Sequence, residues 1–103
     1  MENKEKVFLC DIIMPVYNGL AYVKTCINAI LAYTNDVAYH MYIVDDCSEP
    51  YTASFLENQA QEYSQHISLY RNPKNQGFVQ SCNTGMKLGA APYVVLINSD
   101  VIV

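Results

Sequence analysis

The sequence predicts a three-layer α/β/α fold, in which helices cover both faces of a mostly parallel β-sheet. Short apolar runs of strand length alternate with longer segments in which apolar residues recur at helical spacing. These segments follow one another in the order β-α-β-α-β-α-β, without a repeat or a low-complexity linker. Such alternation is typical of a parallel sheet with right-handed crossovers, and the strand order we expect is 3-2-1-4.

The first two elements are a strand from Val7 to Met14 and a helix from Leu20 to Tyr33. The strand is a nearly continuous apolar run that only Asp11 interrupts. The helix has an amphipathic pattern formed by Leu20, Val23, Cys26, Ile27, Ile30 and Leu31. Between the two elements, Asn18 and Gly19 are expected to shape the turn and cap the helix.

The later elements are recognised in the same way. They are a strand over Met41–Val44, a helix over Tyr51–Tyr63, a strand over Ile67–Tyr70, a helix over Phe78–Leu88 and a strand over Tyr93–Ile97. A turn-rich polar loop from Arg71 to Gly77 precedes the last helix, and Gly89 is placed to end that helix. His40 and His66 come just before strands and are expected at the surface.

Composition limits the classes of function. The chain has 103 residues, of which 51% are hydrophobic, and a net charge of -4. Six Lys and Arg residues are scattered along it, so it lacks the clustered cations that bind nucleic acid. The longest apolar run, Ala90–Ile97, is far shorter than the ~20 residues of a membrane helix, and the start MENKEKV lacks the core of a secretion signal. The four cysteines have no CxxC or zinc spacing. We expect a cytoplasmic chain without a membrane segment, from a parent protein that could be membrane-associated.

Three of the apolar runs are followed by a short segment that contains polar residues, at the point where each strand is expected to end. The segments are Pro15-Val16-Tyr17-Asn18-Gly19, Asp45-Asp46-Cys47-Ser48 and Asn98-Ser99-Asp100. Open α/β sheets bind ligands outside the carboxyl ends of their strands, where the strand order reverses. In the order 3-2-1-4 the first and last strands are neighbours, so the crevice opens at Tyr17 and at residues 98–100, with Asp46 one strand away. The sequence therefore predicts one site at this edge.

The spacing in this region excludes two common phosphate sites. No G-x-G-x-x-G turn follows the first strand, and no G-x-x-x-x-G-K-[ST] loop occurs. A diphosphate beside these carboxylates would need a divalent cation to offset the repulsion, and Asp100 is the predicted anchor for Mg2+ or Mn2+. Arg71 either contacts a phosphate or stays solvated. Asp45, Asp46 and Ser48 have an alternative role in capping the next helix.

Four parts of the chain resemble family 2 glycosyltransferases of the GT-A fold. They are IIMPVYNG, IVDDCSE, the loop RNPKNQGF followed by CNTG, and LINSD. The resemblance runs from about Val7 to Val103. It implies that residues 1–103 are a nucleotide-sugar-binding half-domain. The activity it implies is transfer of a sugar from a nucleotide diphosphate sugar to an acceptor hydroxyl, usually with inversion and with Mg2+ or Mn2+.

The same resemblance implies roles for individual residues. The residues expected to bind the nucleotide are Pro15, Val16, Tyr17, Asp46, Asn83 and Ser99. Tyr17 would stack on the base, with the backbone of Pro15 and Val16 alongside. Asp46 would form a hydrogen bond to the edge of the base, and Asp100 would hold the metal.

The chain departs from the family pattern in two places. The DxD-type motif usually begins with Asp, whereas this chain has Asn98, which offers a neutral oxygen as a second metal ligand. In the family the acceptor pocket and the catalytic base, a carboxylate, follow the donor half, so we expect both beyond Val103. The sequence does not distinguish between a polysaccharide, a glycolipid and a glycoprotein as the acceptor. The fragment is expected to be inactive alone.

Other classes of protein share this alternation of strands and helices. A sugar nucleotidyltransferase would carry a basic Gly-rich loop after the first strand, which is absent. A receiver-like signalling module has its acid pair after the first strand, whereas Asp45 and Asp46 follow the second. A non-catalytic α/β binding module stays an alternative. The apolar last strand, within YVVLINSDVIV, predicts self-association through an exposed sheet edge.

Overall fold

The computed structural model describes residues 9–33 and 38–98 of the chain. It contains the expected elements in the expected order: β1 (Cys10–Val16), α1 (Leu20–Tyr33), β2 (Tyr39–Asp45), α2 (Pro50–Glu62), β3 (Ile67–Arg71), α3 (Phe78–Leu88) and β4 (Tyr93–Leu96). The bounds of α1 and α3 match the prediction. β1 and β2 both extend further toward their carboxyl ends than expected, so that Val16 and Asp45 are still strand residues.

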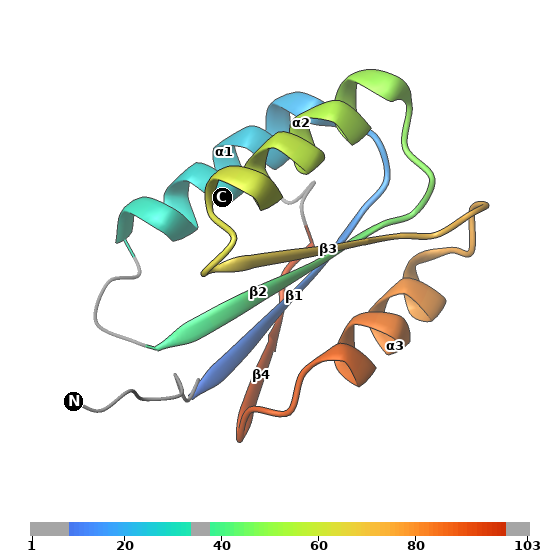
Figure 1. The fold of residues 1–103 in the computed structure, drawn as a ribbon. Coiled ribbons are helices and arrows are strands. Elements are labelled where there is room, and N and C mark those ends of the chain that lie inside the picture. The colour runs from blue at the N-terminus through green and yellow to red at the C-terminus, as the bar shows by residue number, and fades with distance from the viewer. Residues whose placement is uncertain (1–8, 34–37, 99–103) are drawn as a thin grey trace.

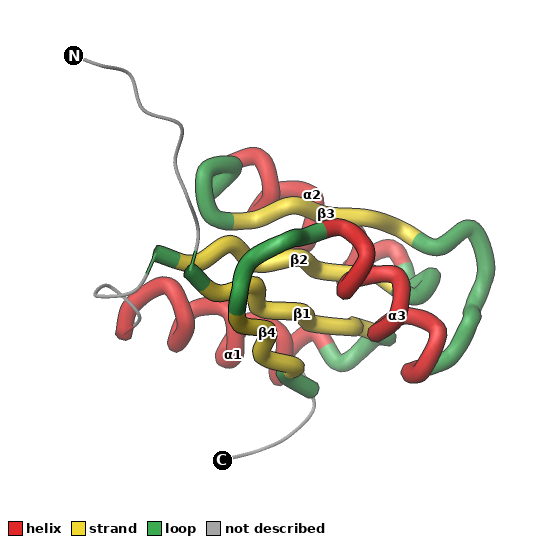
Figure 2. The backbone as a smooth tube through the Cα atoms, turned by 90° about the horizontal axis from the view of Figure 1, so that it is seen from below, coloured by secondary structure: helices red, strands yellow, loops and turns green. Residues whose placement is uncertain are grey.

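The described strands form a sheet in the order β3-β2-β1-β4, and each neighbouring pair is parallel. The predicted strand order is therefore confirmed. Helices α1 and α2 lie on one face of the sheet and α3 covers the other (Figure 1). Viewed from the side of α3, the sheet runs from β3 to β4 with β1 and β2 in the middle (Figure 2). This arrangement gives the two central strands a cover on both faces.

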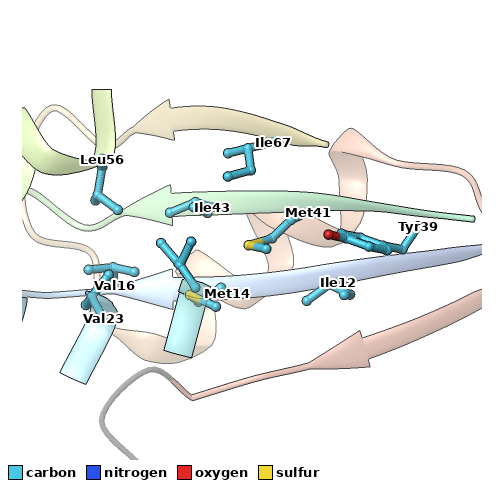
Figure 3. Close-up of a cluster of buried hydrophobic side chains, with 10 residues drawn as sticks. Ile12, Met14, Val16, Val23, Tyr39, Met41, Ile43, Leu56 and Ile67 are labelled. Carbon is cyan, nitrogen blue, oxygen red and sulfur yellow. The ribbon is translucent and has the colours of Figure 1, made fainter. Parts of the chain in front are cut away.

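The main core lies between the sheet and the pair α1 and α2. Every second residue of a strand faces this layer, which is why Met14 of β1 and Ile43 of β2 are completely buried. They pack with Val23 of α1 and Leu56 of α2 in one hydrophobic cluster (Figure 3). Burial of this apolar surface holds the carboxyl ends of β1 and β2 in fixed positions, and those ends carry the polar segments.

Helix α3 packs very closely on the opposite face because it has a glycine at the contact. A Cβ atom on Gly85 would overlap Cγ2 of Ile13 and would lie 3.3 Å from Cγ2 of Val44. Only a residue without a side chain lets the helix approach the sheet this far. The close contact brings the first turn of α3 over the carboxyl ends of β1 and β2.

The two histidines are less exposed than the sequence indicated. His40 is buried because β2 begins at Tyr39, two residues earlier than expected, which makes His40 part of a central strand. Its Nε2 lies 2.7 Å from Oγ of Ser68 on β3. His66 is half-buried, and its ring stacks on that of Tyr39. The expectation of a surface residue was therefore wrong for His40, whereas His66 keeps part of its side chain exposed.

The sheet ends in an exposed strand. The side chains of β4 are between 44% and 64% exposed on both faces, although β4 pairs with β1 in register. β1 and β2 are largely covered by helices, whereas Ile67 is the one buried residue of β3. Among residues 9–33 and 38–98, we find no helix whose length and apolar character would suit it to crossing a lipid bilayer.

Gly85→Ala is expected to lower the free energy of unfolding by about 1–3 kcal/mol, because the new methyl group overlaps Ile13 in a closely packed layer. Helix propensity alone would change stability in the opposite direction, by about 1 kcal/mol. Urea unfolding followed by circular dichroism measures the difference. Gln80→Ala, at an exposed position of the same helix, is the matched control and should change little. A Gly85→Ala variant as stable as the wild type would mean that α3 does not depend on this close contact.

Candidate functional site

A cleft of about 260 Å³ opens where the carboxyl ends of the central strands meet the first turn of α3. The residues that line it are Pro15, Val16, Tyr17, Asp46, Phe78, Ser81 and Asn98. The structure thus brings together residues from three polar segments that are far apart in the sequence. Asn83 is exposed on α3 and is not among the lining residues. Ser99 and Asp100 lie outside the described residues.

Sequence analysis missed two residues of the cleft, Phe78 and Ser81. The sequence predicts Phe78 only as the first residue of a helix, yet its side chain is 52% exposed and lines the cleft, whereas Cys82 is buried. Ser81 is fully buried beside Asn72. Ser81 lies on the same helix face as the apolar residues Phe78 and Cys82, and a polar residue at that place was the available signal that this face meets polar groups.

The Asp46 carboxylate is the centre of the hydrogen bonding around the cleft, and the residue is only 4% exposed. Its Oδ1 accepts hydrogen bonds from Nδ2 of Asn72 at 2.9 Å and from the backbone N–H of Gln76 at 2.6 Å. Its Oδ2 accepts one from the backbone N–H of Gly77 at 2.9 Å. Nδ2 of Asn72 also donates to Oγ of Ser81 at 3.1 Å. One carboxylate therefore holds the loop before α3 against the end of β2.

These contacts keep Asp46 ionised. Burial raises the pKa of this carboxyl, but the hydrogen bonds from Gln76, Asn72, Gly77 and Ser81 lower the pKa by more, so it lies below its ordinary value of 3.8. Gly77 is the N-cap residue of α3, so the carboxylate also sits at the positive end of that helix. At neutral pH the cleft contains a buried anion that accepts hydrogen bonds and donates none.

The neighbouring Asp45 serves the opposite face of the sheet, because successive strand residues alternate. It is 1% exposed, and its Oδ2 lies 2.6 Å from Nη1 of Arg71 in a salt bridge. Its Oδ1 accepts a hydrogen bond from the backbone N–H of Ser48. Arg71 also donates to the carbonyl oxygen of Ser48 at 3.1 Å. Arg71 was expected to be solvated or to contact a phosphate; its side chain is 40% exposed, as the first alternative expects, and it also pairs with Asp45.

The loops after β1 and β2 are joined directly. The backbone N–H of Asn18 donates to Oγ of Ser48 at 2.9 Å, and Oδ1 of Asn18 accepts from the backbone N–H of Glu49 at 2.9 Å. Asn18 and Cys47 both have left-handed φ angles, 57° and 64°, which turn the chain at these points. Glu49, without a side-chain cap bond, is the N-cap of α2. The alternative in which Asp45, Asp46 or Ser48 caps α2 is therefore wrong.

A family model described as Glycosyl transferase family 2 matches residues 11–103. The chain belongs to glycosyl transferase family 2. A curated relative, an uncharacterized glycosyltransferase of Haemophilus influenzae, is 28% identical over 92 residues, which are 89% of this chain and 29% of the relative. The chain spans 29% to 36% of the length of the curated relatives it matches.

Solved structures of glycosyltransferases share the fold. A mannosyltransferase from Pyrobaculum calidifontis, in complex with GDP-Man and Mn2+, superposes with a TM-score of 0.78 at 20% identity, over 91% of this chain and 28% of that one. The complex of S. aureus TarS with UDP-GlcNAc gives a TM-score of 0.75 at 22% identity, over 88% of this chain and 26% of that one. The fold predicted for this family 2 chain is thus confirmed.

Asp46→Asn is expected to lower the free energy of unfolding at pH 7 by about 1–3 kcal/mol, because the amide nitrogen cannot accept the hydrogen bonds of the loop. A lowered pKa in the folded state means that the stabilisation by the carboxylate is present above pH 3.8. It is lost as the pH falls through the pKa of the folded state. Urea unfolding between pH 7 and pH 3 should therefore show a stability difference that shrinks below pH 3.8.

The matched control for this variant is Glu57→Gln, at an exposed position of α2, which should change stability by a few tenths of a kcal/mol at pH 7. A difference between wild type and Asp46→Asn that stays constant over the whole pH range would contradict the role of the charged carboxylate.

Proposed function

We propose that this chain is the donor-binding half-domain of a glycosyltransferase that moves a sugar from a nucleotide diphosphate sugar to an acceptor hydroxyl. Family membership supports the reaction class. The observation that carries the proposal is the cleft itself, in which Tyr17, Asp46 and Asn98 meet at the carboxyl edge of the sheet. This edge, between β1 and its neighbours, is where the strand order reverses and where open α/β sheets bind nucleotides.

The charge of Asp46 limits which base can bind. An ionised carboxylate accepts a hydrogen bond from a ring N–H and repels a ring nitrogen that presents a lone pair. Uracil, thymine and guanine carry an N–H at the ring nitrogen of their pairing edge, whereas cytosine and adenine carry a lone pair there and can donate only from the exocyclic amino group beside it. The donor we propose is therefore a uridine, thymidine or guanosine diphosphate sugar, with its base edge at Asp46 and its ring on Tyr17.

The same charge directs the diphosphate to the other end of the cleft. The amino end of α3 already holds the Asp46 carboxylate, so a phosphate placed there would be repelled. The diphosphate is therefore expected near the end of β4, where Asn98 lines the cleft. Pro15 and Val16 also line the cleft, and we propose that their backbone lies alongside the nucleotide, with Ser99 and Asn83 as further contacts.

A divalent cation fits this arrangement. Among residues 9–33 and 38–98 there is no group of three His, Cys, Asp or Glu side chains that could hold a metal. Mg2+ and Mn2+ can bind through one carboxylate, with phosphate oxygens and water in the other positions. We propose Asp100 as that carboxylate and the side-chain oxygen of Asn98 as a second ligand. The cation would neutralise charge on the diphosphate leaving group.

We place the catalytic base and the acceptor site in sequence beyond Val103, since the chain spans about a third of its relatives. The chain alone is expected to bind the donor and not to transfer the sugar. A polysaccharide, a glycolipid and a glycoprotein all stay open as acceptors.

A reducing compartment such as the cytoplasm suits the four free cysteines, Cys10, Cys26, Cys47 and Cys82. A receiver-like role loses support because both acids of the pair are buried and bonded.

Calorimetric titration of UDP, dTDP, GDP, CDP and ADP tests the donor site. We expect one of the first three to bind and CDP and ADP to bind at least tenfold more weakly, because their bases present a lone pair to Asp46. Mn2+ should strengthen binding, and Asp100→Asn should remove most of that gain. Glu57→Gln is the matched control. Equal affinity for CDP and UDP would sink the assignment of Asp46, and a folded chain that binds no nucleotide would sink the donor site.

We also propose self-association through β4, whose exposed apolar edge can pair with a second copy of the chain. Val95→Lys, a charge in the middle of that strand, is expected to shift the chain toward monomer in sedimentation velocity at micromolar concentrations. Val79→Lys, a comparable change on the exposed side of α3, should leave the distribution unchanged. A wild-type chain that is monomeric at every concentration would contradict the proposal.

A further inference from the structure

Two exposed aromatic side chains line the cleft, and they come from different parts of the chain. Tyr17, in the loop after β1, is 58% exposed, and Phe78, the first residue of α3, is 52% exposed. Asp46 lines the same cleft but is only 4% exposed, so the carboxylate lies deeper than the two rings. The cleft therefore combines two aromatic surfaces near its opening with a buried hydrogen-bond acceptor.

Both aromatic residues stand on backbone that hydrogen bonds hold in place. Phe78 follows Gly77, whose N–H donates to Asp46 and whose carbonyl oxygen accepts from the N–H of Ser81. Tyr17 precedes Asn18, which is bonded to the loop after β2 through both its backbone N–H and its side chain. The backbone that carries both rings is therefore held in place before a ligand binds, which limits the entropy lost on binding.

Phe78 is exposed, as are Val79, Met86 and Leu88 of the same helix, but of these four residues only Phe78 lines the cleft. Cys82, one helical turn further along α3, is buried against the sheet. A phenylalanine that only filled the core would be covered in the same way, whereas the ring of Phe78 borders the cleft. This combination of rings and carboxylate matches a flat ligand that has an aromatic face and a polar edge. Every nucleobase has such a face and such an edge.

We propose that Phe78 is the second aromatic surface of the base site, so that the base of the donor inserts between Phe78 and Tyr17 with its edge toward Asp46. This inference rests on the proposed function and adds a residue to it. Stacking on two sides fixes the plane of the base, and the carboxylate then selects the base by its N–H. Phe78 thus contributes affinity for any base, whereas Asp46 contributes the selectivity.

The test compares Phe78→Ala and Phe78→Tyr with the wild-type chain, using the nucleoside diphosphate that the wild type binds best. Loss of one base-stacking side chain is expected to weaken binding by about 5- to 150-fold. Phe78→Tyr keeps the ring and should retain affinity to within about threefold. Val79→Ala, the adjacent exposed residue outside the cleft, is the matched control and should bind as the wild type does. Circular dichroism and thermal unfolding confirm that each variant is folded.

Inorganic pyrophosphate with Mn2+ is the second probe, because it shares the charged part of the donor and lacks the base. Its affinity should be the same for the wild type and for Phe78→Ala. A Phe78→Ala variant that binds the nucleotide as well as the wild type, while Tyr17→Ala is weakened, overturns the inference and leaves the proposed function standing. Equal losses for nucleotide and pyrophosphate also overturn it, because Phe78 would then support the whole site. A folded wild-type chain that binds no nucleotide overturns both proposals.

Discussion

The buried carboxylate of Asp46 is the constraint on which the carboxyl edge of the sheet depends. It accepts hydrogen bonds from the side chain of Asn72 and from two successive backbone N–H groups, those of Gln76 and Gly77. A buried donor without a partner is costly, so the path of the loop before α3 is set by the position of this one side chain. The same anion faces the cleft. One group therefore holds the loop and, under the proposed function, would also bind the base, so a change in the path of the loop would change the chemistry of the site.

Two adjacent acids perform separate tasks because a strand directs them to opposite faces. Asp45 pairs with Arg71 and holds the loop after β2 on the side of α2, while Asp46 holds the loop after β3 on the side of α3. Asn18 completes the set by joining the loop after β1 to the loop after β2. The segments that surround the cleft are thus tied to one another as well as to the sheet. Such cross-links favour a binding site that is formed before its ligand arrives.

Periodicity was enough to predict the elements, their order and the edge at which the polar segments meet. It was enough because each strand is an apolar run closed by polar residues, and because α1 and α3 have clear helical patterns. It could not show which residues of a helix face the sheet and which line a cleft, so Phe78 and Ser81 were not predicted as cleft residues. The pairing of Arg71 with Asp45 could not be predicted either, because Asp45 lies 26 residues away in the sequence, on a neighbouring strand. His40 was misplaced because the start of β2 carries no turn signal. The roles of Asn83, Ser99 and Asp100 stay predictions.

Gly85 and Ile13 affect the width of the cleft, although neither residue lines it. Helix α3 rests on Ile13 and Val44, so its height above the sheet depends on how much volume residues 85 and 13 fill together. Phe78 lies about two turns from Gly85 on the same helix and rises or falls with it. Homologues with a larger residue at 85 should therefore carry a smaller one at 13, and the two positions should covary. Substitutions in the buried layer beneath α3 can then widen or narrow the cleft, while the lining residues stay the same.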